Sequence, residues 1–163
     1  MLREHFAKLL KRLLEEAQRY YGERLVSLVI FGSVGRGTPR FDSDVDILLV
    51  ADDLPPSRLK RLEEFENVER ALEKDLEGLA QHGIHTVLSP VIKTREEVRK
   101  GSLLFLDMIE DGCILYDRDS FFQSFLKDFA QRLEALGAER VRRGGSWYWV
   151  LKREYKKGEV FEL

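Results

Sequence analysis

The spacing of apolar residues predicts alternating helices and strands. Over the first 21 residues, apolar side chains recur every three or four positions, which predicts an amphipathic helix that ends before Gly22. Two nearly continuous apolar runs of strand length follow, from Leu25 to Phe31 and from Asp44 to Val50. Continuous runs are typical of strands that are covered on both faces. Because a short connection joins them, we expect these two strands to be adjacent in one sheet.

Further helices and strands are predicted along the rest of the chain. An apolar stripe from Ser57 to Gln81 predicts one long charged helix. The segment from Ile84 to Ile92 predicts a third strand, and its Pro90 favours a sheet edge or a strand end. Thr94 and Glu97 have the spacing of a capping box at the start of a short helix. The pattern then predicts helical segments at 102–112 and 120–136 and a short strand at 113–116.

The C-terminal segment has the pattern of a hairpin. A Gly-Gly pair at 144–145 precedes three consecutive aromatic residues, Trp147, Tyr148 and Trp149, whose side chains would alternate between the two faces of a strand. The basic residues that flank them are Arg140, Arg142, Arg143, Lys152, Arg153, Lys156 and Lys157. We favour packing of this arm on the domain over a nucleic-acid or partner surface. The predicted fold class is α+β, a mixed twisted sheet flanked by helices, with a C-terminal helix and a hairpin-like arm.

Composition narrows the classes of function. The chain has 163 residues with 27 basic and 29 acidic side chains, a net charge of -2, so no global positive field attracts nucleic acid. Its single cysteine, Cys113, has no partner for an intramolecular disulfide, and no apolar run has the length of a membrane span. We therefore expect a cytoplasmic protein without a membrane segment, and a homo-oligomer stays open.

Carboxylates and glycines gather between the first two predicted strands. Asp44 and Asp46 are two positions apart in a strand, so their side chains project to the same side. Such paired carboxylates repel each other unless a cation such as Mg²⁺ or Mn²⁺ lies between them. The preceding loop contains Gly32, Ser33, Gly35 and Arg36 within five positions, a composition that suits a turn around phosphate groups.

This stretch, "FGSVGRGTPRFDSDVDILLV", resembles the signature of the DNA polymerase beta-like nucleotidyltransferase superfamily. The matching pattern is Gly32 and Ser33, ten intervening residues, and then Asp-x-Asp at positions 44–46. Within the superfamily the chain is most similar to minimal nucleotidyltransferases, which occur alone or with a HEPN-type helical partner. The segments "FLDMIEDGCILYD" and "YWVLKREYKKGEVFEL" add weaker similarity. The resemblance implies a nucleotidyltransferase domain over 1–117, with the helix and hairpin of 118–163 packed on the same domain.

The resemblance also implies a reaction. An NTP, expected to be ATP, would place its triphosphate on the Gly32, Ser33, Gly35 and Arg36 turn, with metal ions on Asp44 and Asp46. An acceptor hydroxyl on a protein or a small molecule would attack the alpha-phosphorus, and pyrophosphate would leave. Arg36 has a second interpretation, as a structural partner of Asp42 or Asp46. A HEPN-type protein is the partner that the resemblance implies.

One part of the family pattern is absent. Active members usually carry a third carboxylate on a neighbouring strand, but no Asp or Glu occurs between Gly78 and Arg95. His85 is the candidate base or ligand there, because histidine titrates near neutral pH, although a lone histidine is more often a packed or exposed residue. Alternatively, the carboxylate comes from elsewhere, the acceptor needs little activation, or catalysis has been lost.

Two classes of function remain open from the sequence. The first is a metal-dependent nucleotidyltransferase with Asp44, Asp46 and His85 as its catalytic residues. The second is a nucleotide-binding, antitoxin-like module that docks a HEPN-type partner. Retention of costly clustered charge at the Asp pair favours the enzyme, whereas the missing carboxylate favours the module.

Overall fold

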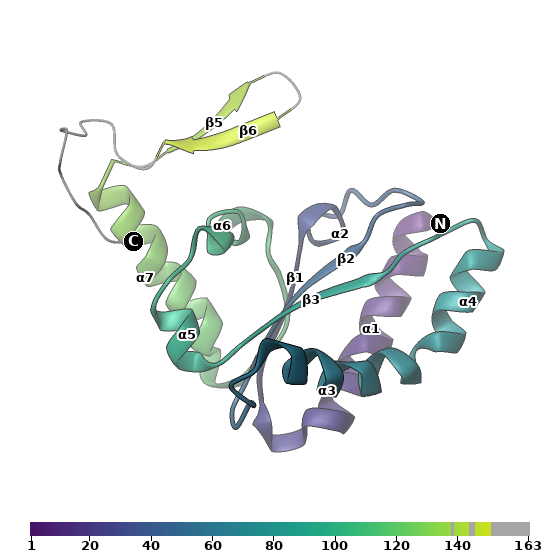
Figure 1. The fold of residues 1–163 in the computed structure, drawn as a ribbon. Coiled ribbons are helices and arrows are strands. Elements are labelled where there is room, and N and C mark those ends of the chain that lie inside the picture. Colours follow the sequence, from purple (N-terminus) through teal and green to yellow (C-terminus); the bar gives the residue numbers. More distant parts are fainter. Residues whose placement is uncertain (138, 144–145, 151–163) are drawn as a thin grey trace.

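The computed structural model describes residues 1–137, 139–143 and 146–150, which form an α+β fold (Figure 1). Its helices are α1 (Leu2–Tyr21), α2 (Gly32–Arg36), α3 (Arg58–Ala71), α4 (Glu73–Gln81), α5 (Arg95–Arg99), α6 (Met108–Asp111) and α7 (Phe121–Ala135). Short 3₁₀ turns are η1 (Gly22–Arg24), η2 (Leu103–Phe105) and η3 (Arg118–Ser120). The strands are β1 (Leu25–Phe31), β2 (Val45–Ala51), β3 (Leu88–Lys93), β4 (Cys113–Asp117), β5 (Glu139–Arg143) and β6 (Ser146–Val150).

Strands β1 to β4 form a mixed sheet in the order β3-β2-β1-β4. β1 is antiparallel to β2 and to β4, whereas β2 and β3 are parallel and are joined through α3 and α4. The expected adjacency of the first two strands is confirmed, and so is the mixed sheet. In this register Phe31, at the end of β1, lies opposite Asp46, near the start of β2.

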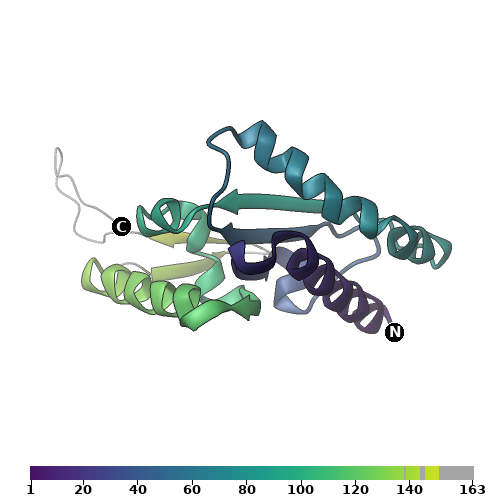
Figure 2. The ribbon, with the colours of Figure 1, turned by 90° about the horizontal axis from the view of Figure 1, so that it is seen from below.

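Helices cover both faces of the sheet and enclose two apolar cores (Figures 1 and 2). The first core packs α1, α3 and α4 against alternate sheet residues such as Val45 and Ile47. Behind the opposite face, α5, α6 and α7 pack against Leu48 and Val50. Because alternate strand residues face opposite ways, Asp46 points to the same side as Leu48 and lies at the end of the second core.

Two predicted boundaries are wrong. The helix expected over Ser57 to Gln81 is divided at Leu72, whose ψ of 2° departs from helical geometry while its side chain is fully buried in the first core. The third strand begins at Leu88 rather than Ile84. His85 precedes it in an irregular segment, in which its backbone N–H donates to the Phe41 carbonyl at 2.8 Å.

The expected helix over 102–112 is also wrong as a single element. It consists of η2 and α6, two short helical pieces separated by a few residues. Ser102 accepts a hydrogen bond from the Leu104 N–H at 3.2 Å and so starts the first piece, while Phe105 and Met108 insert into the second core. The capping box at Thr94 and Glu97 is confirmed, with both of its hydrogen bonds formed.

The C-terminal arm is a hairpin as far as the structure describes it. β5 and β6 pair antiparallel, with Arg142 opposite Trp147, which confirms the predicted hairpin. Packing of this arm on the domain, and the division at 117, stay predictions. The predicted arm residues from 151 onward, including Lys152, Arg153, Lys156 and Lys157, lie outside the described residues. Among the described helices, none combines the length and apolar character needed to cross a membrane.

Candidate active site

The turn from β1 into α2 is built on a glycine that touches a carboxylate. Gly32 has a φ of 69°, in the left-handed region that side chains disfavour. A Cβ at this position would also overlap Oδ2 of Asp46. Both observations favour glycine, and together they place the backbone of the Gly-Ser turn directly against Asp46.

A second glycine brings α2 close to β1. A Cβ on Gly35 would lie 2.5 Å from the Ile30 carbonyl oxygen, so this close approach also requires glycine. No side chain caps the start of α2. The first backbone N–H groups of a helix have no intrahelical acceptor, so those of α2 are donors that face the end of β1.

Two serines join the turn to the segment that carries the aspartates. Ser33 Oγ donates to Ser43 Oγ at 2.9 Å, and Ser43 Oγ accepts from the Arg40 N–H at 2.8 Å. Ser43 directly precedes Asp44, so Ser33 is held beside the Asp pair. The sequence alone gives Ser43 no functional assignment. Its position beside the Asp-x-Asp pattern is the signal that points to this role.

The negative charge of Asp44 acts on the neighbouring carboxyl group of Asp46. Asp44 is exposed just before β2, whereas Asp46 is half-buried within it. Burial raises the pKa of Asp46 above its usual value, the Asp44 charge raises it further, and Arg36 opposes both. A carboxylate that is desolvated beside a like charge is stabilised by a cation.

The donor set fits a divalent cation that is shared with a substrate. Within residues 1–137 no group of three or more His, Cys, Asp or Glu side chains is arranged to hold a metal. Asp44 and Asp46 therefore offer two carboxylates and leave the remaining coordination positions to phosphate oxygens and water, the arrangement that Mg²⁺ prefers.

Arg36 lies near Asp46, whereas His85 contacts the loop that precedes the pair. Arg36, exposed at the end of α2, is close enough to lower the pKa of Asp46. His85 is exposed, and its backbone bond to Phe41 holds it beside the loop that leads to Asp44. Its side chain makes no hydrogen bond or ion pair with any residue in the described ranges.

Ser89 occupies the strand position beside Asp46. The parallel register pairs Asp46 with Ser89 on β3, and paired residues of neighbouring strands point to the same side. A neutral, exposed hydroxyl therefore stands where a third carboxylate is expected. The geometry brings Gly32, Ser33, Gly35, Arg36, Asp44 and Asp46 to one end of the sheet, without a third carboxylate on β3.

Comparison with known proteins agrees, over most of the chain, with the family resemblance seen in the sequence. A family model of the nucleotidyltransferase domain matches residues 10–116. A putative protein adenylyltransferase of Methanocaldococcus jannaschii is 30% identical over 121 residues, which cover 73% of this chain and 77% of the relative.

Solved structures show more distant likeness. A toxin–antitoxin crystal structure with AMP-PNP is 21% identical, covers 83% of this chain and 91% of that chain, and has a TM-score of 0.45. The crystal structure of the toxin–antitoxin MntA-HepT is 18% identical, covers 80% of this chain and 88% of that chain, and has a TM-score of 0.43. Both TM-scores are low, and neither likeness carries an inference about this chain. The matched domain and the relative's identity are sufficient: the chain belongs to the nucleotidyltransferase domain family and is a nucleotidyltransferase.

Proposed function

We propose that this nucleotidyltransferase moves AMP from ATP to a hydroxyl group of a protein in the cytosol. The observation that carries the proposal is the contact of the Gly32 backbone with Asp46. The pKa of Asp46 is raised by burial and by the charge of Asp44. The contact joins a turn suited to phosphate with a carboxylate pair suited to a divalent cation. The name of the archaeal relative, a putative protein adenylyltransferase, favours a protein acceptor over a small molecule.

The turn would hold the triphosphate. The backbone N–H groups at the start of α2 would donate to the beta- and gamma-phosphate oxygens, and Arg36 would add a charge-assisted hydrogen bond. The Ser33 hydroxyl would donate to the same oxygens by exchanging its bond to Ser43 Oγ for one to phosphate. Asp44 and Asp46 would hold Mg²⁺ or Mn²⁺, which supplies charge stabilisation for the transferring group and orients it. Positioning of this kind provides most of the catalysis in phosphoryl-type transfer.

The reaction balances without a redox partner. The acceptor oxygen forms a bond to the alpha-phosphorus, the bond from that phosphorus to the bridging oxygen breaks, and pyrophosphate leaves. The acceptor proton must go to a base or to solvent. His85 is our candidate for this role, because the Phe41 contact holds it beside the loop that leads to Asp44.

Thermal unfolding tests the carboxylates. Mg²⁺ together with ATP should raise the melting temperature of the wild type, since a ligand that binds only the native state stabilises it. Mg²⁺ or ATP alone should have a weaker effect. The variant Asp44→Asn/Asp46→Asn should lose the joint shift, whereas Asp42→Asn, an exposed turn residue in the same loop, should keep it. A wild-type response in the double variant would refute the metal assignment.

The second candidate is a nucleotide-binding, antitoxin-like module that docks a HEPN-type partner and transfers nothing. Ser89 is the observation that favours it, because this hydroxyl is a weaker base than the carboxylate that the family pattern places on the neighbouring strand. The module would show the thermal shift with Mg²⁺ and ATP but would give no labelled product with any acceptor.

A further inference from the structure

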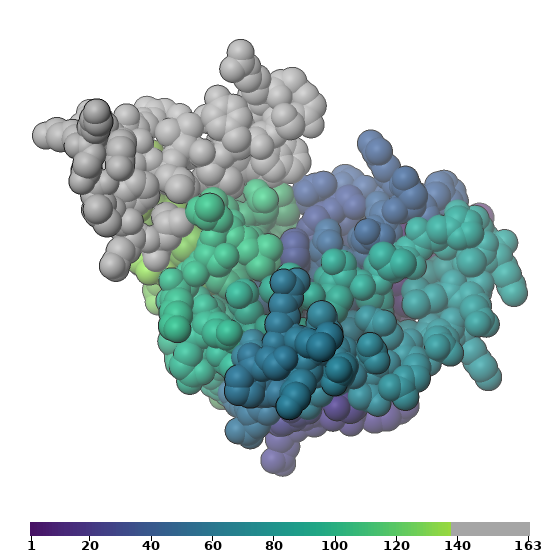
Figure 3. All heavy atoms as spheres, viewed as in Figure 1, coloured from purple at the N-terminus to yellow at the C-terminus, as the bar shows by residue number. Residues whose placement is uncertain are grey.

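A pocket of about 340 Å³ lies against the outer edge strand of the sheet, away from the Gly-Ser turn. Its walls come from the start of α3, from β3, from α5 and from η2. Figure 3 shows this face, on which the atoms of α3 adjoin those of the segment that follows β3. The pocket is at the lower end of the size range of small-molecule sites.

One ion pair lines the pocket, and its two charges neutralise each other. Arg61, only 11% exposed in its side chain, donates from Nη1 to Glu97 Oε1 at 2.7 Å and to the Ile92 carbonyl at 3.2 Å. Burial alone would raise the pKa of Glu97, but hydrogen bonds from Thr94 and Arg61 hold it below its usual value. Glu97 is therefore committed to Arg61.

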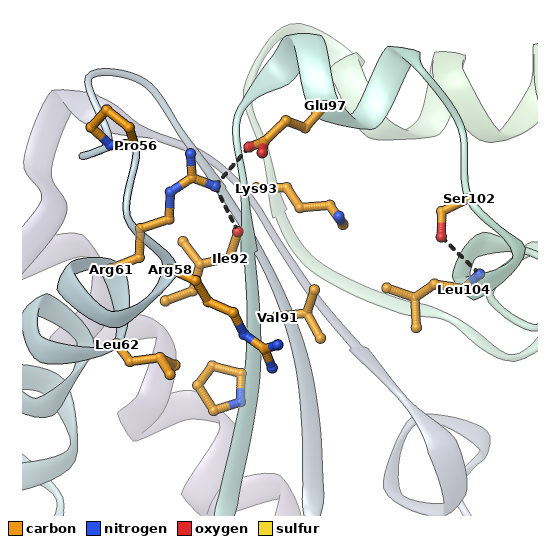
Figure 4. A pocket seen from close by; sticks show the side chains of 11 residues that line it. Pro56, Arg58, Arg61, Leu62, Val91, Ile92, Lys93, Glu97, Ser102 and Leu104 are labelled. Atoms are coloured by element: carbon orange, nitrogen blue, oxygen red, sulfur yellow. Dashed lines mark hydrogen bonds and ion pairs between the residues drawn. The ribbon is translucent and has the colours of Figure 1, made fainter.

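Two further cations face the same space without a counter-charge. Figure 4 shows Arg58 from α3 and Lys93 from β3 extending into the pocket on either side of Val91. Neither side chain forms a hydrogen bond or an ion pair with any residue that the structure describes. Two like charges that share one concave site repel each other, and a bound anion offsets that repulsion.

The edge of β3 is closed to an added strand. The Val87 carbonyl accepts from the Val45 N–H, so residues 88, 90 and 92 direct their backbone groups away from β2. Pro90 has no N–H to donate, and the Ile92 carbonyl already accepts from Arg61. Peptide recognition by strand addition is therefore disfavoured, which leaves recognition of a ligand to the side chains of the pocket.

We propose that this pocket binds a phosphate monoester of small-metabolite size. Arg58 and Lys93 provide two positive charges for a dianion. Ser102, whose Oγ accepts from Leu104, keeps its hydroxyl proton to donate to a third oxygen. Val91 and Leu104 provide an apolar wall for the organic part of the ligand.

The Lys93 end of this site is separate from the Asp pair, although the lining also includes Pro90, which follows Ser89. Lys93 pairs with Val50 in the register that pairs Ser89 with Asp46, four residues away along β3. At the rise of a strand, that separation is about 13 Å. Binding here should therefore need neither Mg²⁺ nor the two aspartates, so failure of this proposal leaves the adenylyl-transfer proposal untouched.

Calorimetric titration of the Asp44→Asn/Asp46→Asn protein, without divalent metal, tests the proposal. Ribose 5-phosphate should bind with one site per chain, inorganic phosphate should bind more weakly, and ribose should not bind. Arg58→Ala and Lys93→Ala should each raise the Kd by about tenfold or more, because each removes a charge-assisted contact.

Lys60→Ala is the matched control. Lys60 is exposed on α3 but does not line the pocket, so this variant should bind like its parent. If Lys60→Ala and Arg58→Ala weaken binding of ribose 5-phosphate equally, the loss reflects the overall charge of the protein, and the proposed site is wrong. Absence of saturable binding of ribose 5-phosphate in the millimolar range would overturn it as well, and so would tighter binding of succinate, a dicarboxylate.

Discussion

The absence of a side chain at Gly32 allows the backbone of the turn to contact Asp46. The positive φ of Gly32 and the position of Asp46 Oδ2 both disfavour a Cβ. Gly37, five residues later, also has a positive φ, of 79°, but open space surrounds its missing Cβ. Comparison of these two glycines therefore distinguishes the effect of backbone strain from the effect of contact with the Asp46 carboxylate.

Replacement of each glycine by alanine should distinguish these effects. Both variants should lose about 1 kcal/mol of stability or more, because alanine disfavours the left-handed region. Only Gly32→Ala should also displace Asp46 and lose the melting-temperature shift with Mg²⁺ and ATP. Retention of the full shift in Gly32→Ala would show that the contact is unimportant for binding.

The raised pKa of Asp46 predicts a cost to stability. Burial, followed by the Asp44 charge, moves this pKa above its ordinary value of 3.8. Folding then favours the protonated form of the Asp46 carboxyl. This preference stabilises the folded protein fully at a pH below the unfolded-state pKa, and the stabilisation is lost as the pH rises through the folded-state pKa.

Asp46→Asn should therefore unfold at a higher temperature than the wild type at pH 7 in the presence of a chelator. The difference should shrink as the pH falls below the ordinary value, where the wild-type carboxyl is protonated as well. Melting curves at both pH values measure this. A variant that is less stable than the wild type at pH 7 would contradict the electrostatic account.

Prediction from sequence succeeds for these residues as a group and fails for their contacts. The spacing of Gly32, Ser33, Asp44 and Asp46 is a local pattern, so their convergence at the end of two adjacent strands follows from chain connectivity. The hydrogen bond from Ser33 to Ser43 depends on the path of the intervening loop, which no residue spacing specifies.

At the scale of elements, Arg61 joins parts that are distant in sequence. From α3 it reaches the Pro55 carbonyl at 2.7 Å, the Ile92 carbonyl on β3 and Glu97 on α5. A buried guanidinium with several acceptors is costly to remove, since each acceptor loses its partner away from full solvent.

Arg61→Leu should lower the free energy of unfolding by about 2 kcal/mol or more, because hydrogen bonds to charged groups contribute about 1.5–3 kcal/mol each. Chemical denaturation measures this loss. Arg70→Leu is the control, because Arg70 is exposed on the same helix and makes no ion pair with the residues described. If the two variants lose similar stability, Arg61 does not join these elements as we describe.

Elements with a local signal are predicted well, and elements that depend on distant contacts are not. β1 matches its apolar run, and α5 begins at its capping box. The break at Leu72 and the late start of β3 depend instead on packing against α1 and on the Val87 and Phe41 contacts, which join segments far apart in sequence.

For the whole molecule, the central claim is that the Asp pair and the Gly-Ser turn carry out adenylyl transfer. Membership of the nucleotidyltransferase family establishes the class of enzyme. Because the neutral Ser89 lies beside Asp46, deprotonation of the acceptor needs a base other than a carboxylate on β3. His85→Ala tests that step, since loss of a general base typically costs about 10²-fold or more in rate.

The most direct measurement is transfer of label from alpha-labelled ATP to protein acceptors in a cell extract with Mg²⁺. Wild-type protein should label at least one acceptor, whereas Asp46→Asn should be slower by about 10³-fold or more, because the metal provides several kcal/mol of transition-state stabilisation. Asp42→Asn should label like the wild type. Wild-type protein that binds ATP but labels nothing, or an Asp46→Asn variant as active as the wild type, would contradict the account.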